Sequence, residues 1–280
     1  MRSLLRPAFG LLLCWQAAGT AYADEAGALV DALNAYRGQY QQCGEQVSQQ
    51  LPPLAADPRL VLPVNGAGDL QQALAGKGYP MANVQAITLS GPRDARAALQ
   101  VVQGSYCKVV LDPQFVDVGV TQAGRDWRIV LGRPLLSAQL GPWQKEGQAL
   151  LAAINSARAQ PRQCGGTPYA AAQPLAWSEV LGSVAESHSR DMANNNYFDH
   201  QDKGGATPGD RAEIGGYTGQ RVGENIAAGQ DSTGKVLAGW LASPGHCANL
   251  MNPQYRELGA GYATDPKSDA GIYWTAMFGG

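Results

Sequence analysis

Three histidines and one acid are the first candidates for chemistry: His188, His200, His246 and Glu224. Glu224 lies among glycine and apolar neighbours in residues 223–227, where a solvated carboxylate is unexpected. His200, Glu224 and His246 together form a zinc-type ligand set, which can also do acid–base work on a bound water. Their separations of 24 and 22 residues match no local metal motif, so these residues taken alone favour a structural hydrogen-bond network.

Two other polar residues, Ser243 and His188, lie close to this set in the sequence or share its chemistry. Ser243 stands three positions before His246, which raises a serine-hydrolase interpretation. The chain has no G-x-S-x-G motif, and a catalytic triad is defined by geometry rather than by spacing, so this interpretation is not favoured. His188 falls on a predicted helix and is assigned to helix packing or to the rim of a cleft.

The residues before His246 predict a rigid setting. A helix is predicted at about 232–242, and Pro244 and Gly245 are expected to end it, because proline lacks the N–H that a helix needs. His246 is therefore expected on a fixed corner that leads into a strand, with Cys247 tying that corner down.

The first 23 residues have the features of an export signal. Arg2 and Arg6 precede an apolar run at 9–15, and Ala21-Tyr22-Ala23 forms a small-x-small cleavage site. That run is too short to cross a bilayer, and no later run is long enough either. We expect an exported protein, periplasmic or extracellular, without a membrane span.

The length of the chain indicates its domain content, and its charge excludes one class of partner. The 280 residues, of which 45% are hydrophobic and 16% charged, suffice for two ordinary domains with buried cores. The formal net charge is -2 and the chain has no stripe of lysine and arginine. Nucleic acid is therefore not an expected partner.

The chain also contains an internal repeat. Residues 29–44 and 150–165 coincide at a constant offset of 121 in leucine, alanine, asparagine, arginine, two glutamines, cysteine and glycine. Residues 107–115 and 247–255 coincide at an offset of 140. We predict two copies of one domain, at 24–140 and 141–280. The first copy lacks 19 residues, the difference between the two offsets, and these fall near 187–210 of the second.

The repeat also predicts the disulfides. Cys14 leaves with the export signal, and an exported chain with four remaining cysteines is expected to pair them. Four cysteines allow three pairings, and if each copy closes its own bridge the pairs are Cys43–Cys107 and Cys164–Cys247.

The second copy is predicted to be α+β. Helical spacing indicates helices at about 145–160, 178–195 and 232–242 and a short one after Thr207, while 257–264 and 271–278 are predicted strands. Helices with a small antiparallel sheet favour a sandwich, in which Trp240 and Trp274 are expected in the core.

Four motifs of the second copy resemble the CAP superfamily. They are Trp240-Leu241-Ala242-Ser243-Pro244-Gly245-His246, Gly223-Glu224-Asn225-Ile226-Ala227, Phe198-Asp199-His200 and His188-Ser189-Arg190-Asp191-Met192. The superfamily, also called SCP domains, comprises cysteine-rich secretory proteins, the venom antigen-five group and plant pathogenesis-related proteins. The resemblance covers about 145–280, is closest to bacterial members, and implies an α-β-α sandwich with a cleft lined by two histidines and two acids.

Carried over to this sequence, the cleft histidines fall on His200 and His246 and the first acid on Glu224. The second acid falls on Ser243, so the cleft departs from the full set, and the loss of one negative ligand weakens the case for tight metal binding. In the first copy His200 falls in the missing segment. Gln85 or Ala86 stands at the position of Glu224, and Tyr106 at that of His246, which predicts the scaffold without the site.

Two classes of function follow from the resemblance. The first is a binding or interaction module outside the cytoplasm, whose cleft or grooves take a small molecule, lipid, glycan or protein. The second is a metal-assisted hydrolase, for example a peptidase, with His200, Glu224 and His246 around a zinc-bound water. Fold alone does not decide between them, and the missing fourth ligand favours binding.

Overall fold

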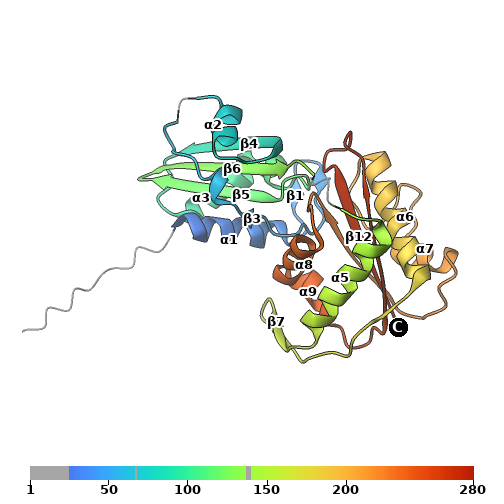
Figure 1. Ribbon diagram of the computed structural model, residues 1–280. Helices are drawn as coiled ribbons and strands as arrows, with labels where there is room; N and C mark the ends of the chain where they lie inside the picture. The colour runs from blue at the N-terminus through green and yellow to red at the C-terminus, as the bar shows by residue number, and fades with distance from the viewer. Residues whose placement is uncertain (1–24, 67, 137–139) are drawn as a thin grey trace, which may run out of the picture.

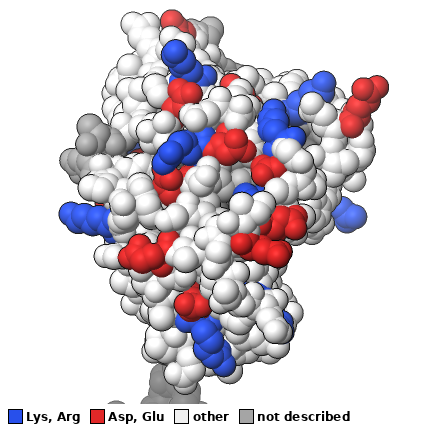
Figure 2. All heavy atoms as spheres, turned by 90° about the vertical axis from the view of Figure 1, so that its right-hand side faces the viewer, with Lys and Arg blue, Asp and Glu red and all other residues white. Residues whose placement is uncertain are grey.

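The computed structural model describes residues 25–66, 68–136 and 140–280, so the predicted export signal at 1–23 lies outside the described residues. The chain forms two α+β parts that lie beside each other (Figure 1). None of the described helices combines the length and apolar character that a bilayer crossing requires. Figure 2 shows the face on the right of Figure 1, where acidic and basic side chains are interspersed.

The carboxy-terminal part is built around one four-stranded sheet. Its strand order is β10-β12-β11-β9, with β12 antiparallel to both neighbours and β9 parallel to β11. In chain order its elements are α5 (Trp143–Arg158), β7 (Arg162–Cys164), β8 (Thr167–Tyr169), β9 (Ala176–Trp177), α6 (Glu179–Asn195), α7 (Pro208–Ile214), β10 (Val222–Ala228), α8 (Thr233–Ala242), α9 (Pro244–Met251), β11 (Glu257–Thr264) and β12 (Ile272–Gly279).

Helices cover both faces of this sheet. On β12 alternate side chains point to opposite faces, as the pleat of a strand requires. Trp274 packs with Leu150 of α5 and with Trp240 of α8, whereas Met277 packs with Leu181 of α6. The predicted α-β-α sandwich is therefore confirmed, and so is the burial of both tryptophans, which are 0% exposed.

Local sequence explains where the site-bearing helices begin and end. The Ser178 hydroxyl accepts a hydrogen bond from the Leu181 N–H at the start of α6, and Asn196, with φ 49°, ends that helix. Thr207 and Asp210 form a capping box at the start of α7. These caps fix both ends of the loop that carries His200.

The prediction for Pro244 was wrong in one respect. Pro244 does follow the end of α8, but it also begins α9, because the first position of a helix does not need the missing N–H. His246 therefore lies in the first turn of a helix and not on a corner leading into a strand.

The amino-terminal part has a sheet of the same topology. Its strand order is β3-β5-β6-β4, with β3 parallel to β5 and β6 antiparallel to both neighbours. In chain order its elements are α1 (Glu25–Arg37), β1 (Gln42–Cys43), β2 (Gln46–Val47), β3 (Ala55–Ala56), the 3-10 helix η1 (Pro58–Leu60), α2 (Leu70–Gly76), β4 (Met81–Ser90), α3 (Ala95–Ser105), α4 (Cys107–Val110), β5 (Asp117–Ala123) and β6 (Asp126–Pro134).

The two parts also repeat specific contacts. Asn34 exchanges two hydrogen bonds with the Leu54 backbone, at 3.1 and 2.8 Å, and Asn155 does the same with Leu175, at 2.9 and 2.8 Å. The disulfides Cys43–Cys107 and Cys164–Cys247 are both present, which confirms the predicted pairing. These correspondences support the two-copy interpretation, which itself stays a prediction.

The missing segment of the first part begins earlier than 187. Gly119 lies against the backbone of Leu60 in η1, just as Gly259 lies against the backbone of Leu181 in α6. η1 thus stands where α6 has its first turn, and the rest of α6 has no counterpart among the described residues of the amino-terminal part. Further along the chain the two parts again make equivalent contacts. The Tyr79 hydroxyl lies against Gly132 in the amino-terminal part, and the Tyr217 hydroxyl lies against Gly279 in the carboxy-terminal part.

Candidate functional site

A pocket of about 530 Å³ opens beside β10, the edge strand of the carboxy-terminal sheet. We call it the cleft. Its lining combines two imidazoles, one carboxylate, several carboxamides and a tyrosine. The lining residues are Gln50, Tyr169, His200, Glu224, Asn225, Gly245, His246, Ala248, Asn249, Asn252 and Pro253.

Glu224 is the buried acid of the cleft, with 8% of its surface exposed. Its Oε1 accepts a hydrogen bond from His200 Nδ1 at 2.7 Å, because an ionised carboxylate can only accept. Its Oε2 accepts one from Arg211 Nη2 at 2.6 Å. Both carboxylate oxygens are therefore engaged by protein groups, and one of the two donors is a permanent cation.

Arg211, on α7, also holds the loop that carries His200. Its Nη1 donates to the backbone carbonyls of His200 at 2.8 Å and Ala206 at 2.9 Å. From α6, His188 Nε2 lies 3.0 Å from the Asp199 carbonyl oxygen and 4.0 Å from Glu224 Oε1. His188 is buried at 1% exposure and does not line the cleft, as expected of a helix-packing residue.

His246 enters the cleft from the other side, on α9. Its Nδ1 lies 2.9 Å from Ser243 Oγ, and Asn225 Nδ2 donates to its backbone carbonyl at 3.1 Å. Asn249 Nδ2 donates to Asn225 Oδ1 at 2.9 Å and to the Glu224 carbonyl at 3.1 Å. A chain of carboxamides thus fixes α9 against β10.

One nitrogen of His246 lacks a partner. His246 is 4% exposed, and its Nε2 is buried without a hydrogen bond to any residue that the structure describes. Whichever tautomer the contact with Ser243 selects, Nε2 keeps one unmet hydrogen bond. Because a buried polar atom without a partner is unfavourable, this nitrogen is suited to contact a ligand in the cleft.

Burial and neighbouring charges set the protonation of these groups. Burial, reinforced by nearby His200, lowers the pKa of His246 to about 3, so the ring is neutral at physiological pH. Burial also lowers the pKa of His188, against the opposing effect of Glu224. Although burial raises the pKa of Glu224, the hydrogen bond from His200 and the electrostatic interactions with His188 and Arg211 together outweigh it, so that pKa is lowered and the carboxylate is ionised.

Of the four residues predicted to form the cleft, three line it: His200, Glu224 and His246. Ser243 does not line it; it is 3% exposed and lies behind His246, where it contacts Nδ1. The structure adds Arg211, whose pairing with Glu224 has no signal in the sequence, since thirteen residues and a loop separate the two. It also adds the carboxamides of Gln50, Asn225, Asn249 and Asn252.

The described residues of the amino-terminal part carry no second copy of this arrangement. Ala86 faces Val130 across the β4–β6 pair, in the place where Glu224 faces Met277 across the β10–β12 pair. Tyr106, predicted at the position of His246, directly precedes α4. All three histidines of the chain lie in the carboxy-terminal part.

A zinc ion needs ligand atoms that are free to coordinate it. Both oxygens of Glu224 and the Nδ1 of His200 are engaged with each other or with Arg211, which leaves the Nε2 atoms of His200 and His246. Across the described ranges, no group of three or more His, Cys, Asp or Glu side chains is placed to hold a metal. The residues do not fit the three-ligand zinc site unless Arg211 leaves Glu224, so the zinc hypothesis stays a prediction.

Comparison with known proteins finds a family model that matches the residues carrying the site. Residues 151–278 match the family model described as "CAP: Cysteine-rich secretory protein family". The uncharacterized protein YkwD of Bacillus subtilis (strain 168) is 37% identical over 106 residues, 38% of this chain and 39% of that protein. The uncharacterized membrane protein YlbC of the same strain is 41% identical over 87 residues, 31% and 25% of the two chains. The chain thus spans well under half of these relatives.

Solved structures are also similar. One is an extracellular protein containing a SCP domain from Bacillus anthracis str. Ames, with TM-score 0.43 and 27% identity over 58% of this chain and 59% of that one. Another is an outer surface protein from Borrelia burgdorferi, with TM-score 0.40 and 20% identity over 49% of this chain and 92% of that one. Residues 151–278, which match the model of the cysteine-rich secretory protein (CAP) family, are under half of this chain, and they carry His200, Glu224, His246 and most of the sandwich described above.

Proposed function

We propose that this protein is an exported binding module whose cleft takes an uncharged polar ligand, a glycan segment being the class that fits best. The observation that carries the proposal concerns His246, a residue that lines the cleft: its Nε2 is buried and lacks a hydrogen bond within the described chain. A ligand hydroxyl or amide can supply that bond, because either group can serve whichever tautomer His246 adopts.

The charges around the cleft favour an uncharged ligand. The charge of Glu224 is balanced by Arg211, and His246 is neutral. The other polar side chains of the cleft are carboxamides, which both donate and accept, and the tyrosine Tyr169. Such groups match the hydroxyl and acetamido groups of a sugar chain.

Hydrolysis is the second class of function, and the geometry supports it less. Ser243 contacts His246 but lies outside the cleft, so its hydroxyl does not face a bound substrate. Glu224 faces His200 and Arg211, and its low pKa leaves it a weak base for activating water. We therefore propose binding as the function.

Export is supported by the cysteines. All four cysteines of the described chain are paired in two disulfides, an arrangement typical of oxidising compartments outside the cytoplasm. One of the similar solved structures is called an extracellular protein and another an outer surface protein. We propose a periplasmic or extracellular location on these grounds.

Titration with tetra-N-acetylchitotetraose, followed by calorimetry and by the imidazole signals of His246, tests the proposal. We expect saturable binding with a shift of those signals. His246→Ala should weaken binding by about tenfold, the equivalent of one good hydrogen bond. Lys267→Ala, in the exposed turn between β11 and β12, is the matched control and should bind like the wild type. Absence of binding at about 10 mM of the probe would overturn the glycan proposal.

A further inference from the structure

One wall of the cleft comes from the amino-terminal part. Residues 49–53, between β2 and β3, cross to the carboxy-terminal part, and we call this segment the strap. Its backbone is held by a hydrogen bond from the Leu51 N–H to the Arg37 carbonyl at 2.9 Å, and Leu51 is 2% exposed. Just beyond it, the Ala55 N–H donates to the Val116 carbonyl at 2.7 Å. The strap is therefore fixed to the amino-terminal sheet.

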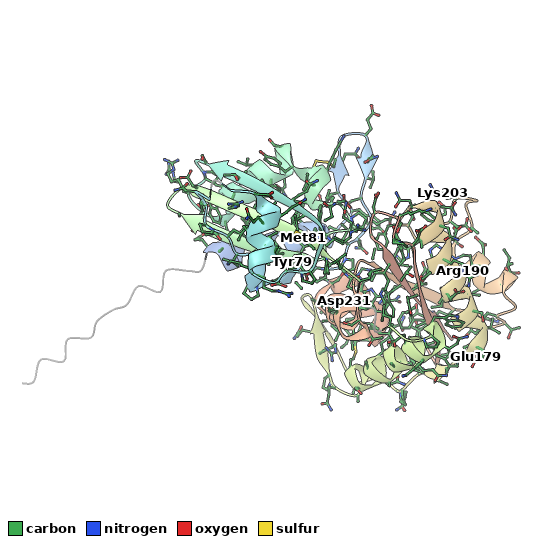
Figure 3. The ribbon with its side chains drawn as sticks, turned by 45° about the horizontal axis from the view of Figure 1, so that its top comes forward. Tyr79, Met81, Glu179, Arg190, Lys203 and Asp231 are labelled. Carbon is green, nitrogen blue, oxygen red and sulfur yellow. A yellow bond between two sulfur atoms is a disulfide. The ribbon has the colours of Figure 1, made fainter. Side chains whose placement is uncertain are left out.

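The strap packs on both sides of the helix that carries His246. In front, Gln50 lines the cleft together with His246. Behind, Leu51 and Pro53 of the strap line a second cavity of about 330 Å³ together with Ser243 and Pro244. Figure 3 shows the β1–β2 hairpin that leads into the strap, with a disulfide beside it, near the boundary between the two parts.

Gln50 is placed to contact a ligand. Gly245, in the first turn of α9, has no side chain, and a Cβ there would lie only 3.1 Å from Gln50 Oε1. The glycine thus lets the Gln50 carboxamide come close to the turn that carries His246. The Gln50 carboxamide forms no hydrogen bond with another residue in the described ranges, so its two N–H groups and its oxygen are available.

Gln49, the preceding residue, contacts the loop that carries His200. Its Nε2 donates to Asp199 Oδ2 at 3.0 Å. The other oxygen of Asp199 accepts from the Gln201 N–H at 2.9 Å, and the Asp199 carbonyl contacts His188 at 3.0 Å. Asp199 is thus held from three directions, and one of them is the strap.

We infer that the binding site is shared between the two parts of the chain: Gln50 contacts the ligand, and Gln49 is a positioning residue for His200. The amino-terminal part, which carries none of the histidines or Glu224, then serves to complete the cleft of its neighbour. The role of Gln50 rests on the proposed function, because it requires a ligand with hydroxyl or amide groups. The role of Gln49 is independent of any ligand.

Gln50→Ala tests the ligand contact, with tetra-N-acetylchitotetraose as the probe. We expect affinity to fall by about fivefold, as for the loss of one neutral hydrogen bond. Gln46→Ala is the matched control, because Gln46 is an exposed glutamine of the hairpin that leads into the strap and it does not line the cleft. Equal affinity of Gln50→Ala and the wild type would overturn the role of Gln50. A wild type that does not bind would instead overturn the proposed function, and with it this role.

Amide hydrogen exchange of the free protein tests Gln49. In Gln49→Ala we expect residues 197–203 to exchange about tenfold faster while β12 keeps its protection, which shows that the protein remains folded. In the double variant Gln49→Glu/Asp199→Asn the donor and acceptor are interchanged, so protection should return toward the wild-type level. Unchanged exchange of 197–203 in Gln49→Ala would overturn the positioning role, whatever the result with the glycan.

Discussion

Arg211 forms an ion pair with Glu224, the acid that lines the cleft, with Arg211 Nη2 2.6 Å from Glu224 Oε2 and the Glu224 side chain 1% exposed. The pair joins α7 to the edge strand β10 and keeps an ionised acid beside two imidazoles. Because Arg211 also binds two carbonyls of the His200 loop, it couples the charge of Glu224 to the position of His200.

Removing Arg211 should be strongly destabilising. Arg211→Met keeps the apolar bulk of the side chain and leaves the Glu224 charge buried without its cation, so we expect a loss of about 3 kcal/mol in the free energy of unfolding, measured with urea. Arg221→Met is the control, because Arg221 is exposed, and it should change stability by no more than about 0.5 kcal/mol. The added substitution Glu224→Gln should recover part of the loss. A loss below about 1 kcal/mol in Arg211→Met would contradict this account.

The low pKa of His246 predicts how stability depends on pH. Its folded pKa of about 3 lies below the ordinary 6.5, so between these values the unfolded chain binds a proton that the folded protein does not. The contribution of neutral His246 to the free energy of unfolding is fully present above about pH 6.5. It is lost as pH falls, by up to about 1.4 kcal/mol per pH unit. His188 changes stability in the same direction, because its pKa is also lowered.

His246→Gln removes this titration and should flatten the dependence of the unfolding free energy between pH 6.5 and 5. Urea unfolding at several pH values in that interval measures the slope. The variant's slope should be smaller than that of the wild type by about 1 kcal/mol per pH unit. Parallel slopes would show that His246 is protonated in the folded protein, contrary to its burial.

Much of the fold was predictable because helix start and stop signals are local in sequence, and because the repeat relates the two halves of the chain to each other. Thr207, Pro208 and Asp210 mark the start of α7, and the structure has a capping box there. The cysteine pairing followed from the repeat alone. Pro244 was harder, because a proline that ends one helix and a proline that begins the next look alike in sequence.

The cleft was predictable only in part. His200, Glu224 and His246 were identified by type and by motif, and they do line one pocket. Gln50 was not identified, because glutamine is an ordinary surface residue. Its contact with Gly245 joins the strap to a helix almost two hundred positions away. Such contacts depend on how the two parts pack, which local patterns do not encode.

The zinc hypothesis can be tested directly by calorimetric titration. If His200, Glu224 and His246 bind zinc, affinity should be micromolar or tighter and should be lost in His200→Ala/His246→Ala. Arg211→Gln should then increase the affinity by about tenfold or more, because Glu224 no longer has to leave its cation. No binding by either the wild type or Arg211→Gln would exclude a zinc site at these three residues.

Close backbone packing makes Gly259 a test of the sandwich. A Cβ on Gly259 would lie 1.9 Å from the Gly182 nitrogen of α6, and neither the helix nor β11 can move without disturbing the face between them. Gly259→Ala should therefore cost at least about 3 kcal/mol of unfolding free energy. Gly234→Ala is the control, because Gly234 lies in the first turn of α8 and a Cβ added there would meet no other atom. This variant should gain up to about 1 kcal/mol of unfolding free energy.

The same substitution in the amino-terminal part tests the equivalence of the two sheets. A Cβ on Gly119 would lie 2.3 Å from the Leu60 carbonyl carbon, so Gly119→Ala should also be destabilising. Its cost should be smaller than that of Gly259→Ala, because η1 is a single short turn that can shift, whereas α6 is packed along its length against β11 and β12. Urea unfolding of the two variants side by side measures the difference. An equal or larger loss in Gly119→Ala would show that η1 is held as firmly as the full helix.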